Sequence, residues 1–372
     1  MIVPVVLGFY FLVCISVVLF NCWKILSGKL LQRRLARWKQ DDHLWFWDKA
    51  AHYPALSAQQ QQLLVRQKVR TLRTNDRLLA FHAAMDEIEA VDAEMVCACM
   101  PLLAQIMQQL YSRCAGRASH MQAYYSYLIT RFQVMRYAPS EQLTTYLLTQ
   151  VREAESIYNL ENALRAIYSS AQVSLVLKAL RTLDGEDGIF LHEKLLVEGL
   201  LTFPEREALI AALWEEFSQF GAPMQELLLD YIRFASGAWR DKMLELLERT
   251  QELEVRLSCL RYFGKYPDAR VQPMLYSLGR QTDAAQWELC AVSMSVLAAY
   301  PGDETVEVLK QGLRSRNWYV RYNAALSLRA LHVSPEQVQD ILSGDDRYAR
   351  EMLQYRLEQR QQAHTPGEKV PV

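Results

Sequence analysis

The chain has 372 residues, a formal net charge of −1 and 51% hydrophobic residues. This apolar content excludes general disorder, and the length allows two ordinary domains or one extended array of repeats. Glycine and proline are sparse, and no long stretch alternates apolar and polar side chains, which argues against a sheet-rich fold. The sequence therefore predicts an all-α protein.

The first element is an uncharged apolar run, residues 2–23, IVPVVLGFYFLVCISVVLFNCW. At about 1.5 Å per residue, a helix of this length covers the roughly 30 Å hydrocarbon core of a bilayer. A cleaved signal peptide would have basic residues before the apolar run and a small-x-small site after it, and neither is present. We therefore expect residues 2–23 to form a retained transmembrane helix.

A basic, tryptophan-rich juxtamembrane segment follows at residues 24–53. Six basic residues precede the first acidic residue, Asp41, and none lies on the other side of the apolar run. This asymmetry predicts a single-pass protein with its N-terminus outside and its soluble part in the cytoplasm, at the inner membrane if the cell is bacterial. The expected membrane-interface residues are Trp23, Lys24, Lys29, Arg33, Arg34, Arg37 and Trp38.

Two interpretations of residues 24–39 remain open. Leu31, Leu35 and Trp38 share one helical face in a basic setting, so the segment could lie along an anionic leaflet. The alternative is a simple continuation of the transmembrane helix toward the soluble domain. Beyond this segment the chain is mildly acidic: the flank contributes +6 to a total of −1, which leaves −7 for residues 40–372. Nucleic acid is therefore not an expected partner.

Residues 54–153 form a predicted N-terminal helical region. Ser57 and Gln60 resemble a capping box that opens a helix through residues 59–72. Two helices that meet near Val91 and Asp92 follow, and then an aromatic-rich helix begins near Met121. We interpret this region as divergent early repeats or as a cap.

The seven cysteines predict reduced thiols. Their number is odd, two lie in the anchor, and the others fall in apolar helical patterns. The spacing of Cys97 and Cys99 differs from that of a zinc knuckle. No disulfide framework is expected.

A repeat is visible in the segment 154–360. In NWYVRYNAALSLRAL, residues 317–331, the pair Ala324-Ala325 is flanked by Val320 and Leu328. Equivalent pairs recur at intervals of 31, 34, 32, 32 and 32 residues: Ser293-Met294, Cys259-Leu260, Leu227-Leu228, Leu195-Leu196 and Ala163-Leu164.

Turn signals divide each period into two helices. We therefore expect about six helical hairpins of 31–34 residues, stacked as an α-solenoid behind the transmembrane helix. Ala324 is expected to face the neighbouring helix of its own hairpin. The tail, residues 361–372, is predicted to be disordered.

The stretch at residues 317–331 resembles the second helix of a HEAT repeat, which has a polar N-cap, a Val-Arg pair, two small residues and a leucine. A second match, LEVRLSCLRYFGKY at residues 253–266, contains Val255-Arg256. The resemblance covers residues 250–335 and extends by its period to about residue 155. It implies an armadillo-like solenoid in which Arg256 and Arg321 tie adjacent repeats together. The chain departs from the pattern at Cys290, where the family has the arginine, and it lacks the usual aspartate before the valine.

Some HEAT-like proteins are enzymes that hydroxylate a lysine derivative, attach bilins or excise alkylated bases. The hydroxylase class carries several iron-binding His-Glu pairs, whereas this chain has one, His192-Glu193, which is expected to be a solvated polar pair. The other histidines lack ligand spacing, and no phosphate loop or serine elbow is present. We therefore expect no catalytic residues, no metal and no cofactor.

One basic stretch, from Val308 to Pro335, contains no carboxylate. It could form a binding ridge for an acidic protein segment, a nucleotide or a lipid headgroup. The alternative, which the sequence favours, is packing of the tryptophans between repeats beside a solvated basic face. The candidate partner-binding residues are Arg314, Arg316, Trp318, Tyr319 and Trp287.

These features together predict a membrane-anchored cytoplasmic scaffold. Its HEAT-like solenoid would bind a protein partner, expected to be a membrane protein, and would contact lipid through the N-terminal anchor. An accessory subunit of a membrane complex, such as one for envelope polymer synthesis, would have this design. The rival interpretation is a HEAT-like enzyme, or a ligand or nucleotide sensor, tethered to the membrane.

Overall fold

The computed structural model describes residues 2–184, 193–281 and 284–363, and over these residues the chain is helical and contains no strand. The predicted all-α class is confirmed for this part of the chain. The chain forms two compact units, residues 1–179 and 180–372, and each is described by itself.

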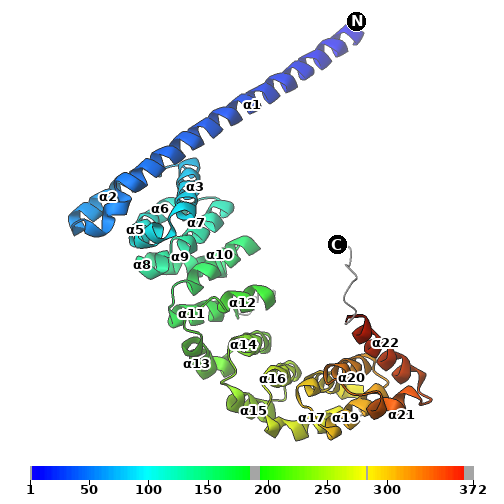
Figure 1. Cartoon of the computed structure of the whole chain (residues 1–372). Coiled ribbons are helices and arrows are strands. Elements are labelled where there is room, and N and C mark those ends of the chain that lie inside the picture. Colours follow the sequence, from blue (N-terminus) through cyan, green and yellow to red (C-terminus); the bar gives the residue numbers. More distant parts are fainter. Residues whose placement is uncertain (1, 185–192, 282–283, 364–372) are drawn as a thin grey trace. The chain divides into compact units, whose positions relative to one another are not determined.

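The first unit begins with an unusually long helix, α1 (Ile2–Asp48), of 47 residues. Figure 1 shows it as one uninterrupted rod whose N-terminal part projects beyond the other helices of the unit. This part is long and apolar enough to cross a membrane, and none of its most apolar stretch is buried against the protein. Residues 24–39 lie within the same helix, so the interpretation as a continuation of the apolar segment agrees with the structure.

Helices α3 and η1 pack on α1, and the other helices of the first unit pack on one another. Helix α1 packs on α3, α2 on α5, and α7 on α10. Their bounds are η1 (Ala50–Ala55), α2 (Ala58–Thr71), α3 (Asn75–Val91), α4 (Ala93–Ala98), α5 (Met100–Gln109), α6 (Tyr111–Cys114), α7 (Ser119–Arg131), α8 (Val134–Tyr137), α9 (Glu141–Arg152) and α10 (Ile157–Tyr168).

Local signals explain several of these boundaries. Ser57 and Gln60 form the predicted reciprocal capping box at the start of α2. Helix α3 ends at Val91, as predicted, because Asp92 caps the next helix through its side chain. The expected second helix is divided at Cys99, since Pro101, near the start of α5, has no N–H to continue the helical hydrogen bonds.

Helix α11 (Val173–Leu183) contains the division between the units, and the second unit follows it. Its helices are α12 (Glu193–Leu200), α13 (Arg206–Glu216), η2 (Phe217–Gln219), α14 (Ala222–Ala235), α15 (Arg240–Arg249), α16 (Leu253–Lys265), η3 (Ala269–Val271), α17 (Gln272–Gly279), η4 (Ala284–Gln286), α18 (Trp287–Val296), η5 (Leu297–Ala299), α19 (Asp303–Leu313), α20 (Trp318–Ala330), η6 (Glu336–Val338), α21 (Gln339–Leu342) and α22 (Arg347–Ala363).

In the second unit, every second helix packs on the next of its own row. The contacts run from α12 to α14, α16, α18, α20 and α22, while α15, α17 and α19 pack on the helices that follow them. Figure 1 shows α13, α15, α17 and α19 along one side of this row. The sequence pairs fall on α10, α12, α14, α16, α18 and α20, and each pair has at least one buried member. The period of 31–34 residues is therefore the spacing between alternate helices.

Small residues allow close contact between α18, α19 and α20. A Cβ added at Gly312 of α19 would lie 3.2 Å from the Cβ of Ala324 and would clash with Met294. Ala324 is fully buried and lies close to Gly312 of α19. It therefore faces the other helix of its own hairpin, as predicted. Ser327 Oγ donates a hydrogen bond of 2.6 Å to the Met294 carbonyl, which joins α20 to α18.

The C-terminal boundary differs slightly from the prediction. Helix α22 continues to Ala363, past the expected end of the repeats at residue 360. Gln361, Gln362 and Ala363 favour a helix or tolerate it well, and no proline or glycine interrupts them. The remaining tail, residues 364–372, lies outside the described residues, as do residues 185–188 of one predicted turn.

Candidate functional site: an arginine cleft and an aromatic face

Three of the predicted partner-binding residues meet in one cleft of about 840 Å³, between the turn that precedes α18 and the turn that precedes α20. We call it the arginine cleft. Arg280, Arg314 and Arg316 are among its described lining residues, and none of those residues is a carboxylate. The rest of the described lining is Gly279, Gln281, Trp287, Cys290, Gln311, Gly312, Ser315, Asn317 and Val320.

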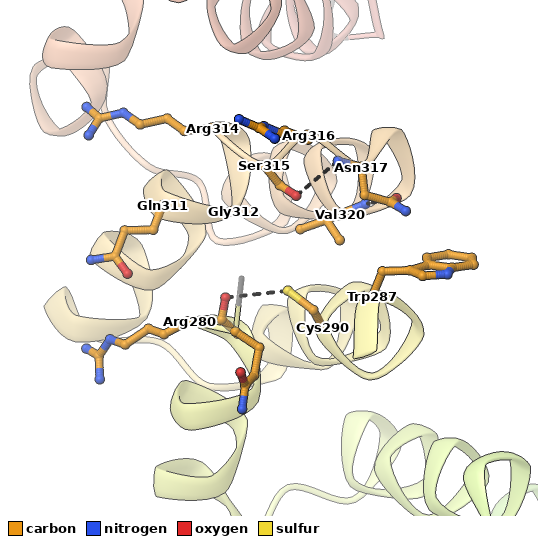
Figure 2. A pocket seen from close by; sticks show the side chains of 12 residues that line it. Arg280, Trp287, Cys290, Gln311, Gly312, Arg314, Ser315, Arg316, Asn317 and Val320 are labelled. Carbon is orange, nitrogen blue, oxygen red and sulfur yellow. Dashed lines mark hydrogen bonds between the residues drawn. The ribbon is translucent and has the colours of Figure 1, made fainter. Parts of the chain in front are cut away.

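The side chains are distributed unevenly around the cleft. In Figure 2, Arg280, Gln311 and Arg314 stand on one side, whereas Trp287 and Asn317 lie toward the other side. Two of the arginines have partners outside the lining: Arg280 pairs with Glu304 at 2.8 Å, and Arg314 pairs with Asp340 at 3.4 Å. Both pairs are exposed to solvent, so each contributes little. No described carboxylate lies within ion-pair distance of the exposed Arg316.

Sequence reasoning missed two members of this arrangement. Arg280 belongs to the preceding hairpin and lies outside the basic stretch. Asp340 lies beyond that stretch, yet it also pairs with Lys310 at 2.9 Å. The basic stretch is therefore partly neutralised by the following α21. The sequence signal that could have identified Arg280 and Asp340 is the repeat period, which brings residues about 32 positions apart onto neighbouring helices.

Cys290 lines the cleft at the position that Arg321 occupies one hairpin later, and each follows a buried framework residue. Arg321 Nη1 donates to the Ser315 carbonyl at 2.7 Å and so fills the space beside its own turn. The Cys290 thiol reaches only the Gly279 carbonyl, at 3.5 Å. Burial raises the pKa of this thiol to about 11, so it is neutral near pH 7. Because the cysteine side chain is much shorter than that of arginine, the space beside Cys290 is part of the cleft.

Arg256 and Arg321, which occupy equivalent positions in two hairpins, have different surroundings. The guanidinium of Arg321 lies 5.5 Å from the Tyr348 ring on α22, so this side chain contacts the next helix of the row as well as its own turn. Arg256 on α16 is half-buried, and its Nε makes no hydrogen bond to any described residue.

Beside the cleft lies an exposed aromatic face, which we define as Trp318, Tyr319, Tyr322, Tyr348 and Tyr355. Trp318 and Tyr319 are 47% and 56% exposed, and the Trp318 ring stacks on Tyr322 at 4.7 Å. On α22, Tyr348 and Tyr355 are 69% and 56% exposed.

Contacts between neighbouring helices hold the aromatic face in place. The guanidinium of Arg356 on α22 lies 4.4 Å from the Tyr322 ring and 5.3 Å from the Tyr355 ring. Tyr319 stacks on Trp287 at 5.4 Å and so links α20 to α18. Trp287 thus takes part in packing between helices, whereas the Trp318 ring stacks within α20 and keeps nearly half of its surface in solvent.

A buried charge cluster joins α1 to the other helices of the first unit. Asp42 is 0% exposed, and Lys68 Nζ of α2 donates to its carboxylate. Arg77 Nη2 of α3 donates to Asp42 Oδ1 at 2.7 Å, and this is the oxygen that Lys68 also contacts. Arg77 Nη1 donates to the Trp38 carbonyl at 3.0 Å. Burial lowers the pKa of Lys68 to about 8, and the Asp42 carboxylate opposes this shift.

Two of the four N-terminal tryptophans belong to this junction. The Lys68 ammonium lies 4.0 Å from the Trp45 ring, and the Arg77 guanidinium lies 5.8 Å from the Trp38 ring. Trp23 is 67% exposed, so it is available to a membrane. The other predicted interface residues, Lys24, Lys29, Arg33, Arg34 and Arg37, also have exposed side chains on α1.

The described residues contain no group of three or more side chains suited to hold a metal ion. His192 lies outside the described residues. His82 sits in a polar cluster, where its Nδ1 lies 3.0 Å from the Tyr124 hydroxyl and its Nε2 lies 3.2 Å from Asp86. Burial raises the pKa of Tyr124 beyond its usual range, which keeps that hydroxyl protonated.

Known proteins do not place the chain in a family: no protein-family model matches it, and no curated protein matches it either.

Proposed function

We propose that this protein is a membrane-anchored scaffold whose HEAT-like solenoid binds an acidic segment of a membrane protein. In this proposal the N-terminus of α1 lies outside, and residues 24–372 lie in the cytoplasm. An accessory subunit of a membrane complex, such as one for envelope polymer synthesis, would need these properties.

The aromatic face is the observation that carries the proposal. It gathers large exposed Trp and Tyr side chains on α20 and α22, and the guanidinium groups of Arg321 and Arg356 lie against its rings. Tyr, Trp and Arg are the residues that most often dominate binding energy at protein interfaces. The exposed Arg316 of the adjoining cleft favours a negatively charged partner.

Three observations support the solenoid and the anchor. Pairs of small or apolar residues recur with the hairpin period, and they lie on alternate helices. The helices of that row pack on one another in sequence. A single rigid helix links the apolar segment to the first unit, and the cationic flank favours retention of that unit in the cytoplasm.

The test is affinity purification of the full chain in detergent, with identification of the membrane proteins that accompany it. We expect Trp318→Ala to lose a specific partner with only a small fall in melting temperature, because the ring is half-exposed. Arg314→Glu combined with Arg316→Glu should also lose that partner. The matched control is Phe234→Ala, since Phe234 is 47% exposed on α14 of the same unit.

Two results would contradict the proposal. One is retention of every partner by the Trp318 and arginine variants. The other is equal loss of partners in the Phe234 control, because that loss would reflect general instability. If Trp318→Ala lowers the free energy of unfolding by roughly 3 to 5 kcal/mol, the melting temperature falls strongly. Trp318 would then be a packing residue.

A further inference from the structure

We propose that the arginine cleft is a binding site for a small phosphate-bearing ligand. This inference goes beyond the scaffold function, because its site lies between two hairpins and is formed mainly by residues other than those of the aromatic face. It starts from Cys290, which stands at the position of Arg256 in the preceding hairpin and of Arg321 in the following one.

The size and the charge of the cleft fit such a ligand. Its volume of about 840 Å³ lies within the range of small-molecule pockets. Three arginine residues line it in a chain whose residues 40–372 carry a net charge of −7. Guanidinium forks match the oxygen geometry of phosphate and bind it with paired, charge-assisted hydrogen bonds.

Neutral hydrogen-bond donors complete the site. Gln281 and Gln311 are exposed amides in the lining. Asn317 accepts hydrogen bonds from the N–H groups of Tyr319 and Val320 at 2.8 and 3.4 Å through Oδ1. This capping role fixes the side-chain oxygen on the helix and leaves the Nδ2 group as a donor for another acceptor.

No described carboxylate lines the cleft. Glu304 and Asp340 pair with Arg280 and Arg314 from outside the lining, and both pairs are exposed. A ligand with several negative charges can compete with such pairs, since exposed ion pairs are weak. Trp287 lies toward the side of the cleft away from Arg280 and Arg314 (Figure 2). A phosphate ligand with a planar ring could therefore contact both sides.

The binding experiment uses the full chain in detergent and equilibrium dialysis with two labelled probes, inorganic pyrophosphate and ATP. We expect saturable binding at one site per chain. Arg280→Gln combined with Arg316→Gln should weaken the binding of both probes at least tenfold. The matched control, Arg249→Gln, removes an arginine that is 77% exposed on α15 and outside the cleft, and it should leave binding unchanged.

The two probes separate a nucleotide from a free phosphate compound. If the adenine ring of ATP contacts the Trp287 indole, ATP binds more tightly than pyrophosphate, and Trp287→Leu weakens the binding of ATP alone. Equal affinities with no effect of Trp287→Leu would identify a phosphate compound without a ring. Both results support a phosphate site.

A second variant tests the origin of the cleft. Cys290→Arg gives this position the residue that Arg256 and Arg321 provide in the two neighbouring hairpins and places a long side chain in the cleft, so it should abolish binding of both probes. The capture of a protein partner through the aromatic face should persist in this variant, which separates this inference from the proposed scaffold function. Three results would overturn the inference: no saturable binding to the wild type, unchanged binding in the double glutamine variant, or unchanged binding in a folded Cys290→Arg variant.

Discussion

Among single residues, Asp42 makes the clearest contribution to the fold. It is the one carboxylate in its buried cluster, where Lys68 and Arg77 both donate to it. We expect Asp42→Asn to destabilise the protein by roughly 3 to 5 kcal/mol, because two buried cations would lose their counter-charge. Chemical unfolding of the full chain in detergent, followed by tryptophan fluorescence, would report the loss.

The adjacent exposed residue provides the control. Asp41→Asn removes the same charge from a solvated position and should change stability by less than about 0.5 kcal/mol. Adding Lys68→Met to Asp42→Asn should recover part of the loss, since it removes one of the unpaired cations. Equal stability of the wild type and Asp42→Asn would show that the cluster does not hold α1 in place.

The Asp42 cluster also shows why part of the structure could not be predicted from sequence. The capping box at Ser57 was predictable, because its two partners lie three residues apart and have a known signature. Lys68 lies 26 residues from Asp42 and Arg77 lies 35 residues from it, and no local pattern connects them. The same reason explains why Arg314 was predicted as a site residue while Arg280 was not.

At the scale of helices, periodic packing was more predictable than helix boundaries. The hydrophobic pairs identified the alternate helices because each pair must be buried between neighbours. The division at Cys99 was missed, since an apolar run that contains Pro101 still resembles one helix in its composition. The cleft was missed as well, because its lining residues come from two successive hairpins and no local pattern connects them.

The continuity of α1 leads to a prediction for this element. Spin labels at residues 20 and 40, in a chain whose exposed cysteines are replaced by serine, should give one narrow distance distribution. Twenty residues of helix rise about 30 Å. Gln32→Pro should shorten and broaden the distribution, because a proline in a helix interior removes a hydrogen bond and bends the helix.

A broad distribution in the unsubstituted helix would contradict the continuous rod. It would instead favour the interpretation in which residues 24–39 lie along the membrane surface. The label pair tests the two alternatives directly, because a segment that turns onto the leaflet cannot keep the helical spacing across residue 24.

For the whole molecule, the charge asymmetry around the apolar segment predicts the orientation in the membrane. A reporter that is active only in the cytoplasm, fused after residue 372, should be active. A reporter that requires the opposite compartment should be inactive. Replacing the six basic residues of the flank with glutamine should give mixed orientations, since these charges supply the bias. The reverse activities in the unmodified protein would place residues 24–372 outside the cytoplasm.

The unbroken α1 has a consequence for affinity. Nineteen residues separate Trp23 from Asp42, which corresponds to a rise of about 28 Å. In the proposed orientation, such a stiff tether confines the first unit to a thin layer beside the bilayer. Partners in the same membrane then meet the protein at an effective concentration that reaches the millimolar range for short tethers. A contact too weak to detect between dilute soluble fragments can therefore be fully occupied when both partners are held in one membrane.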